Sequence, residues 1–374
     1  MTLGCFYNGL FPLFFATPRT SHPTIDMTLP LLITMGDAAG IGPEIIAKAF
    51  RDWPELTARC VVVGDVGTLR AAAAITAQPL ALAVAELHTL ADAPNVPPRC
   101  IPVIQKCEQL RHIKRRRVSG EAGQAAADCI VWAAQAVLSG QATGMVTAPI
   151  HKEALAAAGG WAAQFVGHTD MLQAQAAAFL SQPIERVPVR MMLANDELRV
   201  VLVSIHVSLR QAIEAVTFDQ VLQTLRITHT ALSATLGRAP HIGVAGLNPH
   251  AGEGGLFGTE EQTLIAPAIA AARAEGLQVS GPFAPDTVFM RARNAPGKPG
   301  EFDVVVAMYH DQGLIPVKYL GVAHGVNVTL GLPLVRTSPD HGTAFDIAGT
   351  GLADAASLAC AIKMARQLAA VNLK

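Results

Sequence analysis

Three histidines follow strand-like apolar runs and are suited to bind one divalent metal. They are His206 after residues 200–205, His250 after Asn248-Pro249, and His310 after residues 304–309. Three imidazole nitrogens leave coordination positions free for a substrate, which is typical of catalytic rather than structural zinc. A single histidine after a strand is more often an ordinary loop residue, so spacing alone leaves both interpretations open.

Unusual sequence motifs surround these histidines and recur, in a fixed order, from about Leu31 to the C-terminal helix. They span residues 36–44, 147–152, 167–169, 246–255, 308–313, 325–333 and 336–344. In these motifs the chain resembles the 4-hydroxythreonine-4-phosphate dehydrogenase family of vitamin B6 biosynthesis. The family has close paralogues that oxidise similar phosphorylated hydroxy acids.

The resemblance implies two sets of ligands. The metal ligands are His206, His250 and His310, and the substrate ligands are His168, Thr169, Lys318, Asn327 and Arg336. Arg336 offers a planar fork of donors and Lys318 a point charge, and both suit phosphate or carboxylate oxygens. Asn327 both donates and accepts, which fits a hydroxyl or an amine. Without the resemblance, Lys318 and Arg336 would be interpreted as surface charges.

The reaction implied by the resemblance is oxidation of the substrate's C3 hydroxyl to a ketone, with hydride passing to NAD or NADP. A divalent metal, Zn, Mg or Co, lowers the pKa of that oxygen. Candidate catalytic residues are Lys318, Asp311 and Asp286, and the general base stays open between Lys318, His168 and Asp311. Asp286 and Asp311 are also candidate acceptors for the second N–H of a metal-binding imidazole. The alternative for both is a helix cap or a loop hydrogen bond.

Binding of the cofactor is only weakly indicated. No G-x-G-x-x-G motif occurs, which argues against a Rossmann domain. Gly36, Gly40 and Gly42 lie between a strand and a helix that opens with Pro43, and the backbone N–H groups of such a loop can bind an anion. The alternative is a tight turn in which the three glycines are purely structural.

Several positions depart from the biosynthetic pattern and leave the substrate open. Ala38 stands where the family commonly has Pro, His324 where Arg is frequent, and residues 207–211 read VSLRQ. The expected substrate is 4-phosphooxy-L-threonine, giving 2-amino-3-oxo-4-phosphooxybutanoate and, after decarboxylation, 3-amino-2-oxopropyl phosphate. The alternative is 4-phospho-threonate or 4-phospho-erythronate. A metal-dependent hydrolase and a non-catalytic binding protein are the rival interpretations.

The elements that must position these residues alternate between β-rich apolar runs and Ala-rich helical stretches. This alternation predicts an α/β fold with largely parallel strands. Strands are expected at residues 31–35, 60–64, 145–147, 189–193, 198–205, 241–245, 303–308 and 327–330, and helices at 43–50, 121–138, 217–236, 259–275 and 354–370. Residues 189–205 read as a hairpin, so the sheet should be mixed.

The resemblance implies a fold of the isocitrate/isopropylmalate dehydrogenase type, with two α/β lobes flanking a cleft. We expect one discontinuous lobe from residues 27–147 and 312–374, and a second from 148–311 that carries the metal-binding histidines and a dimer surface. The resemblance also implies a homodimer with the active site at the subunit interface. His206 is the expected contribution of the partner, and the 189–205 hairpin the expected apolar dimer surface. Residues 1–26 are interpreted as a disordered or non-native extension.

Composition sets outer limits on function. The chain has 374 residues, is 51% hydrophobic and 15% charged, and carries a formal net charge of −1. This composition supports a large core and gives no electrostatic indication of nucleic-acid binding. The six cysteines form no CxxC pair, as expected of reduced cytoplasmic thiols. No apolar run reaches the roughly 18 residues that a membrane span needs.

Overall fold

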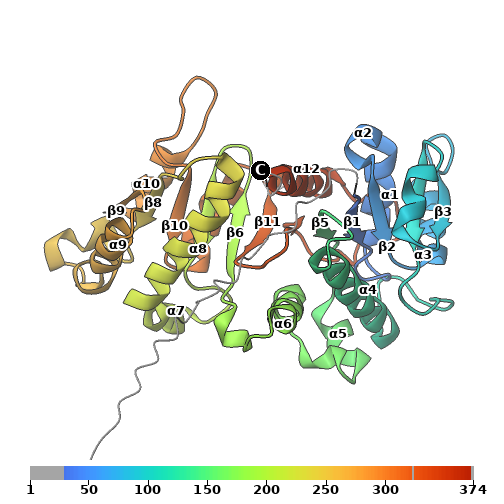
Figure 1. Ribbon diagram of the computed structural model, residues 1–374, viewed down its shortest axis with the longest axis horizontal. Coiled ribbons are helices and arrows are strands. Elements are labelled where there is room, and N and C mark those ends of the chain that lie inside the picture. Colours follow the sequence, from blue (N-terminus) through green and yellow to red (C-terminus); the bar gives the residue numbers. More distant parts are fainter. Residues whose placement is uncertain (1–28, 322–323, 372–374) are drawn as a thin grey trace, which may run out of the picture.

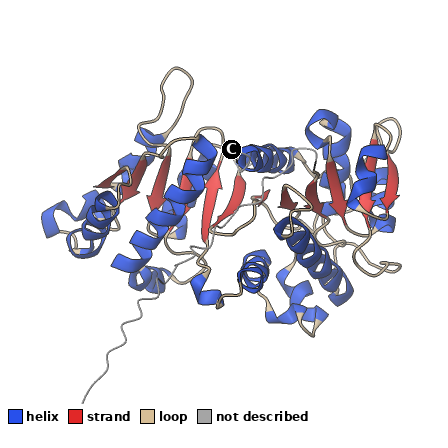
Figure 2. Cartoon of the chain, viewed as in Figure 1, coloured by secondary structure: helices blue, strands red, loops and turns tan. Residues whose placement is uncertain are grey.

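A computed structural model describes residues 29–321 and 324–371, and the expected extension at residues 1–26 lies outside this part of the chain. Helices cover both faces of one twelve-stranded sheet (Figures 1 and 2). The strand order is β3-β4-β2-β1-β5-β12-β11-β6-β7-β10-β8-β9. The predicted α/β class is confirmed. None of the helices in the described residues is both long and apolar enough to span a membrane.

The strands are short and mostly buried, as expected of a sheet covered on both faces. Their bounds are β1 Leu31–Thr34, β2 Cys60–Val63, β3 Ala83–Leu87, β4 Cys100–Ile104, β5 Gly144–Thr147, β6 Arg190–Ala194, β7 Arg199–Leu202, β8 Ile242–Ala245, β9 Val279–Phe283, β10 Val304–Ala307, β11 Val326–Leu330 and β12 Arg336–Pro339.

The α-helices that connect them run mostly from the end of one strand to the start of the next. Their bounds are α1 Gly42–Asp52, α2 Pro54–Thr57, α3 Val66–Ile75, α4 Gly120–Leu138, α5 Lys152–Ala158, α6 His168–Leu180, α7 Leu209–Ala215, α8 Phe218–Leu236, α9 Ala266–Ala274, α10 Pro285–Ala292, α11 His310–Tyr319 and α12 Ala356–Val371. Short 3₁₀ turns are η1 Leu90–Asn95, η2 Ala162–Gln164, η3 Ile184–Arg186 and η4 Pro249–Gly255, and η5 Glu261–Ile265 is a π-turn.

The sheet is mixed, as predicted. β6 pairs antiparallel with β7 and with β11, and β11 pairs antiparallel with β12, whereas the other pairs are parallel. The predicted hairpin therefore exists, but β6 and β7 are inner strands of the sheet. Most of their apolar side chains are buried within this chain, and the dimer surface expected at residues 189–205 stays a prediction.

The two faces of the sheet carry separate cores. One core joins β-strand side chains to α1, α3, α8, α9 and α12. The other face is covered by α4, α5 and α6 over one half of the sheet and by α10 and α11 over the other. The register pairs Arg336 with Met145 and Asn327 with Leu193, so both polar side chains point to this second face, between the two groups of helices.

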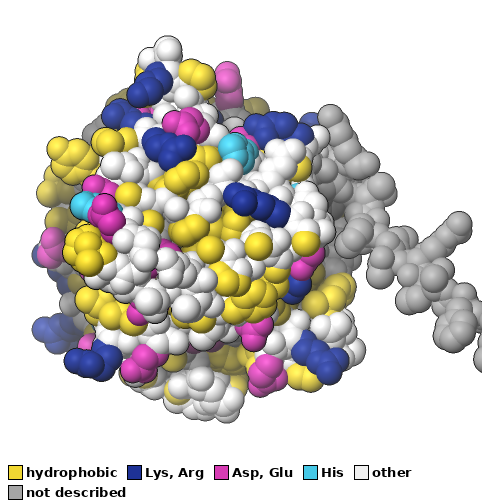
Figure 3. Space-filling view, turned by 90° about the vertical axis from the view of Figure 1, so that its left-hand side faces the viewer, with side chains coloured by type: hydrophobic (Ala, Val, Ile, Leu, Met, Phe, Trp, Pro, Cys, Tyr) yellow, Lys and Arg dark blue, Asp and Glu magenta, His cyan; other side chains and the backbone are white. Residues whose placement is uncertain are grey.

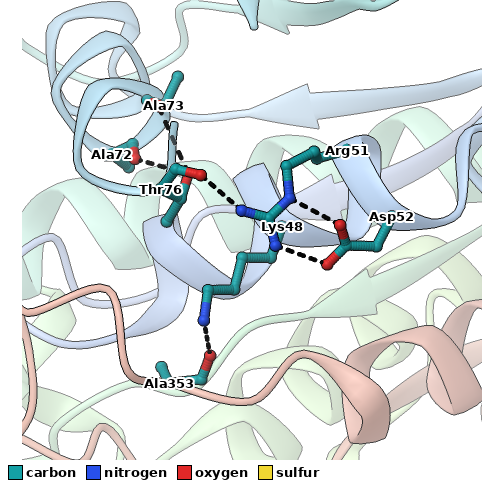
Figure 4. Close-up of polar contacts among 7 residues, drawn as sticks. All are labelled: Lys48, Arg51, Asp52, Ala72, Ala73, Thr76 and Ala353. Atoms are coloured by element: carbon teal, nitrogen blue, oxygen red, sulfur yellow. Dashed lines mark hydrogen bonds and ion pairs between the residues drawn. The ribbon is translucent and has the colours of Figure 1, made fainter. Parts of the chain in front are cut away.

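Helix α1 is fixed at its C-terminal end by polar contacts (Figure 4). Lys48 Nζ donates to the Ala353 carbonyl at 2.7 Å, and Arg51 donates to the Thr76 carbonyl at the end of α3. Arg51 also forms a paired contact with Asp52. These contacts join α1 to the end of α3 and to the segment before α12.

The lobe bounds stay a prediction, but three helices do not pack as those bounds would suggest. α5 and α6, expected in the second lobe, pack against α4 of the first. α11, expected mostly in the first lobe, packs against β7 and β10. Helices from both expected lobes therefore approach the sheet face that carries Arg336.

Candidate functional site

Arg336 is a buried cation without a carboxylate partner among the described residues. It is 4% exposed on β12. Its Nε and Nη2 donate to the Thr147 hydroxyl at 3.1 and 2.7 Å, and Nη1 donates to the Thr329 hydroxyl at 3.0 Å. Burial lowers its pKa to about 10. A buried, unpaired charge is costly, so an anionic partner would stabilise this guanidinium.

His168 begins helix α6 and lies beside Arg336. Burial lowers the pKa of its imidazole well below 6.5, and the nearby Arg336 charge lowers it further, against a hydrogen bond with the Ala148 carbonyl. Its Nε2 is buried with no hydrogen-bond partner in the described chain. His168 is therefore a neutral imidazole with one free nitrogen. Thr169 follows it in the first turn of α6 and is partly exposed.

Asn327 and Lys318 approach the same face from other elements. Asn327 is partly buried on β11, opposite Ser338 of β12. Lys318, in the last turn of α11, forms an ion pair with Asp340, whose side chain is 9% exposed. The structure thus places His168 near Arg336 and Asn327 on the strand next to β12. Lys318, unlike Arg336, already has a carboxylate partner.

Two of the predicted metal ligands are neighbours in one chain. The ring centroids of His206 and His310 are 5.5 Å apart. They line a cavity of about 460 Å³ formed by Ser204, Ile205, His206, Val207, Leu209, Ala212, Tyr309, His310 and Asp311. The resemblance led us to expect His206 from a partner chain, whereas in this chain it lies beside His310.

His250 does not join this pair. It lies in η4 and its side chain is 63% exposed, with Nδ1 in contact with Glu253 Oε2 at 2.7 Å. That contact raises the pKa of His250. Residues 250–254 all have left-handed backbone conformations, with φ between 42° and 78°. Within the described residues no three His, Cys, Asp or Glu side chains are placed to hold a metal.

The two predicted carboxylates near the histidines are placed differently. Asp311 Oδ1 contacts His310 Nδ1 at 2.7 Å, which would leave Nε2 of that ring for a metal. Asp286, in α10, is exposed and acts on His250 only through its charge, which raises the pKa of that residue. One chain therefore brings together two of the three predicted metal ligands, His206 and His310, with Asp311 in contact with His310.

The histidine pair adjoins the helices around Arg336. Burial lowers the pKa of His206, the Lys152 and His310 charges lower it further, and Asp170 opposes them. Lys152 begins α5 and Asp170 lies in α6, next to His168 and Thr169. The anion site and the histidine pair are thus neighbouring parts of one region.

The three loop glycines are explained by the fold itself. A Cβ on Gly36 would lie 2.4 Å from the Pro149 carbonyl oxygen, and one on Gly42 would lie 2.4 Å from that of Met35. A Cβ on Gly40 would meet Thr343 at 2.9 Å. Close packing within the protein therefore requires all three, and their role in cofactor binding stays a prediction.

Sequence reasoning assigned no role to several polar side chains of this region. The buried atoms Thr34 Oγ1, Asp37 Oδ2, His151 Nδ1 and His341 Nε2 have no hydrogen-bond partner in the described part of the chain. All four follow or end strands β1, β5 and β12, at the carboxyl edge of the parallel strands. Asp37 and His151 do occur in family-like motifs, but their burial was not visible in the sequence.

Comparison with known proteins identifies the family. The model of the family "Pyridoxal phosphate biosynthetic protein PdxA" matches residues 56–365. A 4-hydroxythreonine-4-phosphate dehydrogenase from Beijerinckia indica is 50% identical over 339 residues, 91% of this chain and 95% of the relative. A D-threonate 4-phosphate dehydrogenase from Salmonella typhimurium is 42% identical over 342 residues, 91% and 99% of the two chains.

The fold agrees with this assignment. A crystal structure of 4-hydroxythreonine-4-phosphate dehydrogenase from Klebsiella pneumoniae superimposes with a TM-score of 0.79 and 40% sequence identity, covering 92% of this chain and 98% of that one. Sequence and fold thus agree over nearly the whole chain. The protein belongs to the PdxA family of pyridoxal phosphate biosynthetic proteins.

Proposed function

We propose that this protein is a nicotinamide-dependent dehydrogenase that oxidises the C3 hydroxyl of a four-carbon, 4-phosphorylated hydroxy acid. The observation that carries the proposal is the buried Arg336 guanidinium, which has only hydroxyl partners among the described residues and lies beside the neutral His168. A phosphate or carboxylate of the substrate supplies the missing negative charge. The cofactor is NAD or NADP.

The substrate is 4-phosphooxy-L-threonine. The product, 2-amino-3-oxo-4-phosphooxybutanoate, is a β-keto acid that decarboxylates to 3-amino-2-oxopropyl phosphate, an intermediate for pyridoxal 5'-phosphate biosynthesis. D-threonate 4-phosphate is the second candidate, because a dehydrogenase of that name is 42% identical to this chain. Ala38, His324 and the 207–211 segment favour it, and 4-phospho-erythronate belongs to the same class.

The residues of the site have three roles: binding the anionic groups of the substrate, orienting its polar groups and accepting a proton. Arg336 and Lys318 hold the anionic ends of the substrate, and Asn327 and Thr169 orient its polar groups. His168 takes the proton of the C3 hydroxyl at Nε2, because its lowered pKa keeps that nitrogen unprotonated. Asp311 is held by His310, and Lys318 by Asp340, so both are less suited to this step.

A divalent metal, Zn, Mg or Co, fits the histidine site. His206 and His310 would hold it in one chain, with Asp311 fixing the His310 ring. Bound there, the metal supplies Lewis-acid stabilisation of the oxygen at C3. His250, or its copy in a second chain, is the third ligand.

A second copy of the chain completes the histidine site, and the protein works as a cytoplasmic homodimer. Exposed apolar side chains lie on α7 and α11, the two helices that contribute Leu209, Ala212, His310 and Asp311 to the cavity. Leu209 and Ile213 lie on α7, and Ile315 and Tyr319 on α11, where Tyr319 is 91% exposed. Apolar side chains exposed around an incomplete site indicate an interface. On the face shown in Figure 3, cationic, anionic and apolar side chains are interspersed.

The decisive test is reduction of NAD or NADP, followed by absorbance, with 4-phosphorylated hydroxythreonine, threonate and erythronate in parallel. One of these substrates should reduce the cofactor in a metal-dependent reaction. Hydrolysis of esters or amides without nicotinamide would instead establish a hydrolase. Tight binding of the phosphorylated ligands without turnover under any metal would establish a binding protein.

A further inference from the structure

Two aspartates at the ends of neighbouring parallel strands are equally buried but differently partnered. Asp65 follows β2 and is 2% exposed. Its Oδ2 accepts from the Thr68 amide and hydroxyl at 2.7 Å each, and its Oδ1 accepts from Gln105 and Leu110. The fold therefore uses both oxygens of Asp65.

Asp37 follows β1 and is 1% exposed, but the fold uses only one of its oxygens. Oδ1 accepts from the Ala39 amide at 2.8 Å, whereas Oδ2 is buried without a partner among the described residues. Two other unpartnered atoms lie nearby in the fold: Oγ1 of the fully buried Thr34, at the end of β1, and Nδ1 of His151, after the neighbouring strand β5. Unsatisfied buried polar atoms destabilise a fold and are uncommon unless they serve a ligand.

These side chains are close to one another and to the anion site. His151 is near enough for its charge to lower the pKa of Asp37, against the larger effect of burial, which raises it. Thr34 pairs in register with Thr147, whose hydroxyl accepts from Arg336.

The outer wall of this cluster is aromatic. The His151 ring stacks on the Phe345 ring, with centroids 4.7 Å apart and planes inclined by 28°. Both residues are partly exposed. The cluster thus combines a flat aromatic surface with a buried carboxyl whose Oδ2 has no hydrogen-bond partner among the described residues.

We propose that Thr34, Asp37 and His151 form the pocket for the nicotinamide end of the cofactor, next to the substrate anion held by Arg336. This inference rests on the proposed dehydrogenase function. The oxidised nicotinamide ring is a planar cation, so it matches both the aromatic wall and the Asp37 carboxylate. Its carboxamide can donate to Oδ2 and accept from the Thr34 hydroxyl.

The charge of the ring changes during the reaction. The hydride leaves C3 with both electrons of the C–H bond and enters the ring, which becomes neutral, while the hydroxyl proton goes to His168. The attraction of Asp37 is therefore present for the oxidised cofactor and lost for the reduced one. We expect Asp37 to favour binding of the oxidised form and release of the reduced form.

Asp37→Asn tests this electrostatic preference, because it keeps Oδ1 for the Ala39 amide and removes the charge. Dissociation constants of the oxidised and reduced cofactor are measured by calorimetry and by fluorescence. Binding of the oxidised form should weaken about tenfold, and binding of the reduced form should stay within about twofold. Asp65→Asn is the matched control and should lower Tm without changing the ratio of the two constants. Equal weakening of both forms by Asp37→Asn, or no weakening, overturns the proposal.

Thr34→Val separates a ligand role from a structural one, because it replaces the unpartnered hydroxyl by a methyl group of similar size. A ligand role predicts an unchanged or higher Tm of the free protein together with weaker cofactor binding. A lower Tm with unchanged cofactor binding would overturn the proposal. If the wild-type protein binds neither cofactor form, the proposed dehydrogenase function itself fails; if it binds both and the variants match it, only the inference about this pocket fails.

Discussion

The surroundings of Arg336 and the histidine pair are neighbours, but they differ in how one chain assembles them. The polar partners of Arg336 all lie close by in the sheet, whereas His250 lies apart from His206 and His310. Arg336 is buried and held by Thr147 and Thr329, whose strands belong to the same sheet. The side chain of His250, in contrast, is 63% exposed and contacts Glu253. No group of three possible metal ligands is found among the described residues. Strand register fixes the first site within one chain, whereas loops fix the second.

The backbone reflects the same difference. The ligands from β11 and β12 lie in regular strands, while His206 and His250 have left-handed φ values of 50° and 52°. Residues other than glycine adopt this conformation at a cost, and such strain clusters at functional sites. The two loops that carry His206 and His250 thus have the backbone conformation that often accompanies functional residues.

The largest expected effect is complementation between metal-site variants. His206→Ala and His250→Ala should each lower activity about 10²–10³-fold, the typical loss when one group that stabilises charge is removed. If these residues come from different chains of one site, mixed dimers contain one intact site. Mixing the two inactive variants after subunit exchange should then restore about a quarter of wild-type activity.

A second mixture of variants serves as the control for this experiment. His206 and His310 lie in ring contact within one chain, so mixing His206→Ala with His310→Ala should restore no activity. Restoration with His310→Ala would show that the contact within one chain is not the functional one. No restoration in either mixture would place all the histidines of a site in one chain.

The next largest effect is expected at Arg336. Arg336→Ala removes a charge-assisted contact with the substrate anion, worth about 1.5–3 kcal/mol. The Michaelis constant for the phosphorylated substrate should rise roughly tenfold to over a hundredfold, with metal affinity nearly unchanged. Because no described carboxylate is left unpaired, Tm should fall little. Unfolding of the variant, with normal kinetics of the folded fraction, would show that Arg336 is structural.

The anion site should also make stability depend on pH. The folded-state pKa of His168 is well below 6.5, so the unfolded chain binds more protons at acidic pH. The free energy of unfolding should be independent of this group above about pH 6.5 and should fall as the pH drops below it. Urea unfolding between pH 5 and 8 measures the slope, and His168→Gln should reduce it. His206 keeps part of the slope, because burial lowers its pKa too.

The layers of the fold were predictable, but several of its elements were not. The predicted helices at 121–138 and 217–236 agree closely with α4 and α8, because their long Ala-rich or capped sequences are distinctive. Strand β3 was missed since its residues are mostly exposed or only partly buried, and β12 was missed because RTSP reads as polar. The buried position of β12 results from its pairing with β5 and β11, which only the folded chain reveals.

The candidate site shows the same limit. Residue types predicted Arg336 and Lys318 as anion ligands only with the help of the family motifs. The sequence could not show that Arg336 has no carboxylate partner among the described residues and that Lys318 has one. Lys318 lies in α11 and Asp340 follows β12, and only the folded chain brings the two together. The sequence also could not distinguish Asp37 from Asp65. The two differ in their hydrogen bonds, because Oδ2 of Asp37 has no partner among the described residues whereas Oδ2 of Asp65 accepts from Thr68.

The smallest expected effect separates the two cations of the anion site. Asp340 neutralises part of the Lys318 charge, and the Lys318 side chain is 37% exposed, so its contribution to substrate binding should be smaller than that of Arg336. Asp340→Asn releases the ammonium group for the substrate, and the Michaelis constant should fall about twofold to threefold. Lys318→Met should raise it, and in the double variant Asp340→Asn should bring no further gain. If Asp340→Asn raises the constant in both backgrounds, Asp340 itself binds the substrate and the ion pair does not restrain Lys318.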